Sequence, residues 1–370
     1  MEYVLSMVMM IFMAIAAVDQ MFLKGKLGLG SEMERGIAAM GPLVLSMAGI
    51  MCIAPVLGRG LETIVAPLFR MLGVDPAMTA GMLFAVDMGG LPLAQAMTEN
   101  QDIIMLSGVI LSTTMGVTIV FTIPVVLGIC RKEDMKEILM GIVIGIISVP
   151  FGLIAGSMAA GIPLSFTIAN SFPVLILCIV LAVVLLRFPD QTLVFFQKFG
   201  VCLNWICLIS LVIAAVEEKL GIVVIPGMDP LGEQLKMIGI IGITLAGAYP
   251  FVAVLKRILA PALKQVGKIL GVGEIAVAGM LACLANAFLL FDMLKDMDRK
   301  GKIVAMAFVV PSMGILGAHL GYVSAAMPEG VVPMVAAKVT AGVTAVILAE
   351  GFTALQKPGK SYVPGDKMAG

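Results

Sequence analysis

The chain has 370 residues, of which 60% are hydrophobic and only 13% are charged, and its mean hydropathy is +1.10. Soluble domains average roughly 45–50% apolar and about 25% charged residues, so this composition excludes an ordinary soluble fold. The net charge is zero and no basic run is long enough to follow a phosphate backbone, which excludes nucleic acid as a partner. The six cysteines are scattered through apolar segments without metal-ligand spacing, so they predict neither a metal centre nor a disulfide framework.

The apolar residues gather into long segments. A transmembrane helix needs about 20 mostly apolar residues, and about eleven segments approach that length. The frequent glycines and prolines, 41 and 19 of them, are typical of membrane helices that are broken or closely packed. The sequence therefore predicts an all-α, polytopic integral membrane protein. In chain order the segments are 3–22, 37–58, 76–97, 104–129, 138–160, 168–187, 199–216, 236–255, 274–294, 303–326 and 331–350.

The second half of the chain resembles the first half at a constant offset. Residues 15–19 (Ile-Ala-Ala-Val-Asp) match 213–217 (Ile-Ala-Ala-Val-Glu), and residues 80–83 match 278–281 (both Ala-Gly-Met-Leu), each pair 198 positions apart. Internal duplication of apolar bundles is typical of secondary transporters, which bind their substrate where the copies meet. We therefore predict that the protein transports a solute. We expect the chain to have four parts: repeat 1 at 1–160, a connecting helix at 161–197, repeat 2 at 198–350 and a polar C-terminal tail at 351–370.

The lysines and arginines bear on the topology, because they favour the cytoplasmic side of a membrane. If every segment crosses, the basic residues divide almost evenly between the two faces. If the third segment of each copy (76–97 and 274–294) dips in and returns on the same side, most of them fall on one face. A non-crossing second segment fits nearly as well. We expect two inverted repeats with broken or re-entrant helices, about nine full crossings, the N-terminus outside and the C-terminus inside.

Two polar residues at equivalent places are the main candidates for a substrate site. Asp87 precedes the helix breakers Gly89, Gly90 and Pro92, so its carboxylate and the freed glycine carbonyls form a candidate cation site. The structural alternative is an aspartate that caps the following half-helix. Asn286 lies one place past the repeat partner of Asp87, and a pseudo-twofold axis would bring the two together; its amide would bind a hydroxyl. A plain helix–helix hydrogen bond is the alternative for Asn286.

Several further residues have weaker claims to the site. Thr114 and Ser312 occupy equivalent places in the fourth segments, where they line a pocket or bond to their own helical turn. His319, the single histidine, either relays protons or fills a structural role. Tyr249 is a candidate to face a cation, against a packing role. Lys338 is the one basic residue inside a segment, and it either snorkels to the interface or pairs with an acid.

Several chemistries leave no trace in the sequence. There is no Walker loop, the GxGxxG-like runs follow no strand, and one histidine in a membrane segment makes a Ser/His/Asp set implausible. We therefore expect no cofactor, no metal and no enzymatic activity. The expected partners are a small-molecule substrate and membrane lipid, and a homo-oligomer is compatible with the sequence.

An ordered string of motifs identifies a family resemblance. The motifs are 84–90 (Phe-Ala-Val-Asp-Met-Gly-Gly), 115–128 from Met115 to Gly128, 247–250 (Gly-Ala-Tyr-Pro), 278–286 ending at Asn286, and 319–322 (His-Leu-Gly-Tyr). Together they resemble the bacterial ethanolamine-utilisation permease family from the first helix to about Ala349. Two positions depart from the family pattern, Ala318 where an aspartate is common and Val117 where a proline is common.

The resemblance implies a multi-pass inner-membrane protein that takes up ethanolamine for ethanolamine utilisation. Ethanolamine needs an acid or several carbonyls for its ammonium and one polar group for its hydroxyl, and the candidates above supply both. A transporter of another small amine or polar solute is the nearest alternative. A membrane-embedded enzyme acting on lipid-like substrates and a non-transporting anchor or sensor are the alternatives from other classes.

Overall fold

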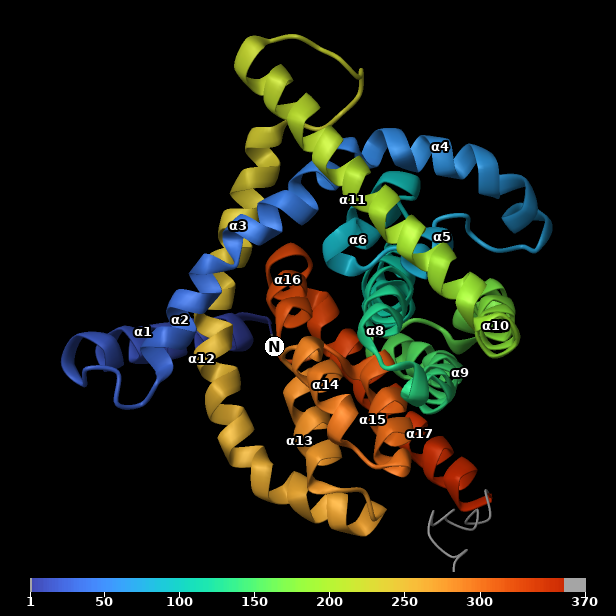
Figure 1. Cartoon of the computed structure of the whole chain (residues 1–370). Coiled ribbons are helices and arrows are strands. Elements are labelled where there is room, and N and C mark those ends of the chain that lie inside the picture. The colour runs from blue at the N-terminus through green and yellow to red at the C-terminus, as the bar shows by residue number, and fades with distance from the viewer. Residues whose placement is uncertain (1, 356–370) are drawn as a thin grey trace, which may run out of the picture.

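The computed structural model describes residues 2–355, apart from the side chains of residues 2–6 and of several positions within 256–270. Every regular element in the described residues is helical (Figure 1). Seven stretches of this part are long and apolar enough to cross a membrane, namely Leu29–Met71, Gln101–Ile129, Lys132–Ala159, Leu164–Arg187, Pro189–Leu220, Leu231–Leu255 and Pro328–Leu355. The all-α prediction is confirmed, whereas the eleven apolar segments and the two inverted repeats are not confirmed by these seven stretches.

Three of the expected segments are interrupted. Segment 76–97 divides into α5 (Met78–Leu83), the 3₁₀ turn η2 (Val86–Met88) and α6 (Gly90–Met97). Segment 274–294 divides into α13 (Glu274–Cys283) and α14 (Ala287–Met293). Segment 303–326 divides into α15 (Arg299–Ser312) and α16 (Ala318–Ala326), a break that hydropathy did not predict.

The third interruption has a local cause. Pro311 lies in the last turn of α15, where it has no backbone N–H to donate, and Gly314 follows with a φ of 69°, which ends the helix. The N–H groups of Gly314 and Leu316 instead bond to the carbonyls of Cys283 and Leu284, at 3.0 and 2.7 Å. Two backbone hydrogen bonds therefore join the break between α15 and α16 to the break between α13 and α14.

The remaining elements complete the chain. In the first half they are α1 (Glu2–Phe22), α2 (Leu29–Ala38), α3 (Met40–Leu43), the π-helix η1 (Val44–Ala48), α4 (Gly49–Met71), α7 (Gln101–Ile103), the π-helices η3 (Ile104–Gly116) and η4 (Thr118–Thr122), α8 (Ile123–Ile129), η5 (Lys132–Asp134) and α9 (Met135–Ala159). In the second half they are α10 (Leu164–Arg187), α11 (Pro189–Leu220), α12 (Leu231–Leu270), η6 (Leu294–Asp296), η7 (Pro328–Gly330) and α17 (Val331–Leu355).

The helix bounds of the two halves correspond at the 198-residue offset. The last residues of α1 and α11, Phe22 and Leu220, are 198 positions apart. Helix α9 matches α17 to within two residues, and the break after α5 matches the break after α13. One stretch differs, because α2, α3, η1 and α4 stand where the other half has the single long α12, which bows along one side of the molecule (Figure 1).

The domain boundaries predicted from the sequence can be located on the helices. The connecting stretch 161–197 holds α10 and the first turns of α11, which begins at Pro189. Residues 351–355 of the expected tail continue α17, and the rest of the tail lies outside the described residues.

The matching helices α9 and α17 pack closely against each other. Glycines permit the close approach: a Cβ built on Gly152 would lie 2.6 Å from the carbonyl oxygen of Ala337, and one on Gly156 would lie 2.9 Å from that of Pro333. Helix α15 also packs on α9, where a Cβ on Gly145 would lie 2.5 Å from Val310. Small residues therefore set the helix spacing here, as is common in membrane bundles.

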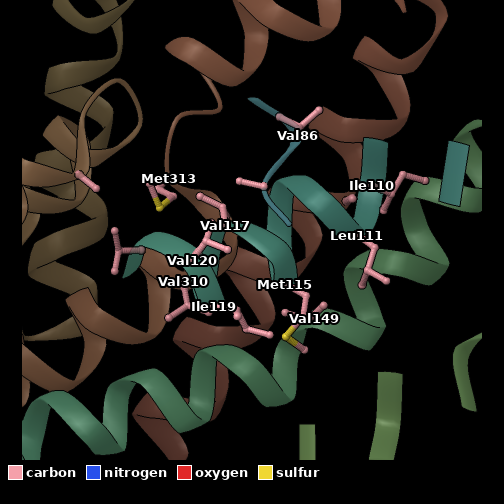
Figure 2. Packing of buried hydrophobic residues seen from close by; sticks show 14 of the residues in the cluster. Val86, Ile110, Leu111, Met115, Val117, Ile119, Val120, Val149, Val310 and Met313 are labelled. Carbon is pink, nitrogen blue, oxygen red and sulfur yellow. The ribbon is translucent and has the colours of Figure 1, made fainter. Parts of the chain in front are cut away.

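The 13-residue π-helix η3 lies in the interior, with every residue buried. Its apolar side chains Ile110, Leu111 and Met115 belong to the core that also contains Val149 of α9 and Val310 of α15 (Figure 2). The whole Gln101–Ile129 stretch is shielded by the rest of the chain. The stretch Gln101–Ile129 therefore lies at the centre of the bundle, surrounded by the broken helices, and we call it the central pillar.

Candidate functional site

The turn that carries Asp87 lies among the broken helices. Asp87 occupies η2, between α5 and α6, and η2 packs against α16 and η3. The residue as a whole is half-buried. The sequence folds this way because Phe84 and Ala85 take extended backbone angles and Gly89 follows at a φ of 101°. Those angles end one helix and start the next around the acid.

The two glycines after Asp87 hold the shape of this turn. A Cβ on Gly89 would lie 2.7 Å from Ile50 Cγ1, and one on Gly90 would lie 2.6 Å from the Cβ of Ser112. The carbonyl of Gly89 accepts the first helical bond of α6, from the N–H of Leu93 at 2.9 Å. The turn therefore uses the Gly89 carbonyl for the helix, whereas the sequence suggested that it was free to bind a cation.

Lys338 of α17 is fully buried and neither snorkels nor pairs directly with an acid, unlike either sequence expectation. Its ammonium donates to three backbone carbonyls: those of Thr113 in η3, Pro311 at 3.3 Å and Met313 at 2.9 Å. The last turn of a helix leaves carbonyls without intrahelical partners, which explains why those of Pro311 and Met313 are available. The three donors of one lysine ammonium therefore all have acceptors.

Two further polar residues of α16 face the same region. His319 is 3% exposed and its Nδ1 has no hydrogen-bond partner; its ring lies beside Gly314, where a Cβ would be 3.3 Å away. Tyr322, one helical turn further on, is 2% exposed. A buried nitrogen without a partner is uncommon in a folded protein and marks a place where a ligand or water group fits.

These residues form one electrostatic group. Asp87 is close enough to interact with both Lys338 and Tyr322, and His319 is close enough to interact with Lys338. We call Asp87, His319, Tyr322 and Lys338 the central polar cluster. Because backbone carbonyls hold the ammonium of Lys338, the carboxylate of Asp87 is not consumed by a direct ion pair with it.

The two candidate hydroxyls are already engaged. Thr114 Oγ1 donates to the carbonyls of Ile110 at 2.8 Å and Leu111 at 3.2 Å in its own helix. Ser312 Oγ donates to the backbone carbonyl of Lys338 at 3.3 Å, and this bond ties the end of α15 to α17. Both side chains are buried and serve the helices around the cluster.

Asn286 and Tyr249 lie together in a different place, a cavity of about 350 Å³ that we call the side pocket. Its lining also includes Glu32, Arg35 and Arg257, and the Arg35 guanidinium carbon lies 6.0 Å from the Tyr249 ring centre. Asn286 is exposed, and its Oδ1 caps α14 by accepting from the N–H of Phe288 at 3.0 Å. Asp87 is not part of this lining.

The structure therefore divides the predicted site residues into two sets. Asp87, Gly89, Gly90, Thr114, Ser312 and His319 lie in or next to the central polar cluster, whereas Asn286 and Tyr249 line the side pocket. Sequence reasoning missed the binding of Lys338 to carbonyls and the place of Tyr322 beside Asp87. The signal for Lys338 was its isolation in an apolar helix, and the signal for Tyr322 was its place at the end of the motif 319–322.

The described part of the chain also bears on metals, because no group of three His, Cys, Asp or Glu side chains there is placed to hold a metal ion. The fold and the site define the class: a multi-pass α-helical membrane protein with broken helices meeting around buried polar groups.

Comparison with known proteins gives the particular family. The family model described as "Ethanolamine utilisation protein, EutH" matches residues 1–351, and the chain belongs to this family. It is 42% identical over 338 residues to a "Probable ethanolamine permease EutH" of Listeria monocytogenes, with 91% of this chain and 90% of that protein covered. It is 40% identical over 376 residues to the Salmonella typhimurium protein of the same name, with 92% of each covered. No solved structure matches the chain.

A third relative carries no functional name. The "Uncharacterized protein YxeR" of Bacillus subtilis is 39% identical over 329 residues, with 89% of each chain covered. The resemblance drawn from the motifs of the sequence is thus confirmed at the level of the family.

Proposed function

We propose that this protein carries ethanolamine across the bacterial inner membrane and so supplies the pathway that uses it. Its family membership and the names of its relatives support this substrate. The observation that carries the proposal is Asp87, a half-buried residue set at a helix break in an apolar bundle with seven candidate spans, whose carboxylate makes no ion pair with any side chain that the structure describes. A charge in such a place is costly unless a partner or a task compensates for it.

Asp87 binds the ammonium end of the substrate. Ethanolamine is a primary ammonium at neutral pH, and a charged hydrogen bond between it and a carboxylate is worth about 1.5–3 kcal/mol. The carbonyls that hold Lys338 leave Asp87 free for this role.

His319 binds the hydroxyl end of the substrate. Its Nδ1 is buried and without a partner, and it belongs to the same cluster as Asp87. Thr114 and Ser312 are weaker choices, because their hydroxyl protons are given to backbone carbonyls. A buried group that bonds the hydroxyl discriminates against ethylamine, which leaves that group unsatisfied.

The side pocket serves as the place of approach. Glu32 offers a carboxylate and Tyr249 an aromatic face to an arriving ammonium, and Asn286 stands at the break between α13 and α14. This break is hydrogen-bonded to the break before α16, and His319 lies in α16. The pocket and the cluster are thus connected through one pair of hydrogen-bonded helix breaks.

The two halves act as inverted repeats that rock against each other. The shared offset of the helix bounds supports a repeat, and the distribution of basic residues supports the inversion, with the N-terminus outside and the C-terminus inside. Exposed apolar side chains on α10 and α11, such as Ile179, Phe195 and Trp205, face lipid. We assign the protein no chemical step, and the hydroxyls of Thr114 and Ser312 donate to backbone carbonyls rather than to a base.

Uptake of labelled ethanolamine into sealed membrane vesicles tests the proposal. With Asp87→Asn we expect a 10- to 100-fold loss of apparent affinity, since about 1.5–3 kcal/mol of ammonium binding is removed. Asp190→Asn is the matched control, because Asp190 is exposed at the start of α11. Unchanged uptake by Asp87→Asn at equal protein level removes Asp87 from the site. Absence of uptake by the unaltered protein in sealed liposomes refutes the carrier.

A further inference from the structure

The three carbonyls around Lys338 have the composition of a cation site. In carriers with discontinuous helices, unwound backbone carbonyls and the C-terminal ends of half-helices coordinate the coupling ion. Here the carbonyls of Pro311 and Met313 come from the end of α15, and that of Thr113 comes from the π-helix η3. In this protein a lysine ammonium from α17 already occupies the position that such an ion would take.

We propose that the carbonyls of Thr113, Pro311 and Met313 form a monovalent-cation site that Lys338 fills with its own ammonium, so that the protein needs no sodium ion. The part that concerns transport rests on the proposed function, whereas the cation site itself does not. The ligand class that the site accepts when the lysine side chain is removed is a small monovalent cation: sodium, potassium, ammonium or methylammonium.

The burial of the site explains why a tethered charge is effective. Lys338 is 0% exposed and Ser312, whose hydroxyl bonds to the Lys338 backbone, is 2% exposed. A free ion must lose its hydration shell to enter such a place and can leave again, whereas the lysine is delivered by folding. Three carbonyls suit an ammonium in particular, because it has three protons to donate.

The same arrangement fixes three elements relative to one another. Lys338 joins α17 to η3 and to the end of α15, each of which contributes at least one carbonyl. The site also lies beside Asp87 and His319 without using either as a ligand. A cation bound there therefore contributes positive charge to the cluster and joins α17 to its neighbours.

The experiment measures thermal unfolding of the purified full-length protein in chloride salts of sodium, potassium, ammonium and methylammonium at equal ionic strength. N-methyl-D-glucamine chloride provides a cation too large for the site. The variants are Lys338→Ala, which removes the stem and the charge, and Lys338→Met, which keeps an apolar stem. Lys136→Ala is the control, because Lys136 is exposed on α9.

We expect the unaltered protein and Lys136→Ala to unfold at the same temperature in every salt. Both Lys338 variants unfold at a lower temperature in N-methyl-D-glucamine chloride, and at least one small cation raises that temperature saturably by several degrees. If neither variant responds to any small cation, the three carbonyls are only the hydrogen-bond partners of a structural lysine and the proposal is wrong.

A second measurement covers the case in which neither variant folds. Ethanolamine uptake by the unaltered protein is compared with all sodium replaced by N-methyl-D-glucamine, and we expect equal initial rates. A fall in rate without sodium overturns the proposal. The unfolding measurements use no ethanolamine, so they stand even if the chain carries another solute, and a failure of uptake with every amine tested counts against the proposed function alone.

Discussion

The ammonium of Lys338 in α17 donates to the carbonyl oxygen of Met313 at 2.9 Å. This hydrogen bond joins α17 to the end of α15, where the helix is broken. Met313 also lies within reach of the His319 ring. One backbone position thus connects the buried charge to the polar groups that we assign to the substrate. The buried ammonium of Lys338 and the proposed site for the substrate amine therefore belong to the same cluster.

The His319 assignment predicts a change in selectivity. We expect His319→Phe to reduce uptake of ethanolamine about tenfold or more while reducing uptake of ethylamine much less, because only ethanolamine has a hydroxyl to bond. The measurement is competition of each unlabelled amine against labelled ethanolamine in vesicles. Equal losses for the two amines would show that the histidine does not recognise the hydroxyl.

Asn286 tests the side pocket against the central polar cluster. Its Oδ1 caps α14, and Asn286→Ser keeps an oxygen that accepts from the N–H of Phe288 but loses the amide donor. We expect the serine variant to keep the affinity for ethanolamine to within about twofold. Asn286→Ala, which loses the cap, should cost about 1 kcal/mol of stability. A large loss of affinity in the serine variant would move the hydroxyl site to the side pocket.

Asp19 predicts a stability effect without a transport effect. Its side chain is 0% exposed and accepts from the N–H groups of Leu27 and Leu29 at 2.9 Å and of Gly30 at 3.2 Å. Burial and these three backbone donors, two of them in the first turn of α2, make Asp19 the side chain that caps the start of α2. We expect Asp19→Ala to cost about 2–4 kcal/mol and Asp19→Asn less, because an amide oxygen still accepts.

The check for Asp19 is thermal unfolding in detergent, together with uptake at equal protein level. Asp190→Ala is the exposed control. A variant Asp19→Ala as stable as the control would mean that water replaces the carboxylate without cost.

Gly89 is expected to resist substitution. Its φ is 101°, and a Cβ would lie 2.7 Å from Ile50 Cγ1, so Gly89→Ala combines backbone strain with a clash and should cost about 1–3 kcal/mol. Gly200→Ala is the matched control, since nothing lies within 4 Å of its Cβ position in α11 and alanine favours the helix. Comparison of unfolding temperatures decides, and equal temperatures would contradict the turn geometry around Asp87.

Gly152 tests the packing of the two matching helices. A Cβ there would lie 2.6 Å from the backbone oxygen of Ala337, which cannot move aside as a flexible side chain would. We expect Gly152→Ala to push α9 from α17 and cost about 1–3 kcal/mol, whereas Gly60→Ala in α4, with open space around it, should be neutral. Unfolding temperatures again provide the measurement, and a neutral Gly152→Ala would rule out close contact at this point.

Much of the architecture follows from the sequence alone. The break after Asp87 is predictable because Gly89, Gly90 and Pro92 stand within six residues of it, and residues of this kind end helices wherever they lie. The break after Ser312 carries similar residues, Pro311 and Gly314, but an apolar run hides them from a reading based on hydropathy. Counting apolar segments does not reveal such a break, because hydropathy measures how strongly a segment prefers an apolar environment and not whether its helix is continuous.

The direction of a buried side chain is the part that the sequence leaves undetermined. Lys338 lies in an apolar helix on any reading, yet whether its ammonium reaches the interface or the interior depends on how α17 is rotated. Packing of α17 on α9 sets that rotation. The same holds for Asn286. Its distance from Asp87 depends on the tertiary hydrogen bonds that join the two broken helices.

The π-helix η3 has one consequence for motion. An α-helix turns by about 100° per residue and the wider π-helix by less, so a change of winding within η3 would turn the residues beyond it around the helix axis. Thr113 lies near the end of η3, where such a turn would carry its carbonyl away from the Lys338 ammonium. A rotation of this kind at Thr113 would therefore break one of the three hydrogen bonds of the Lys338 ammonium.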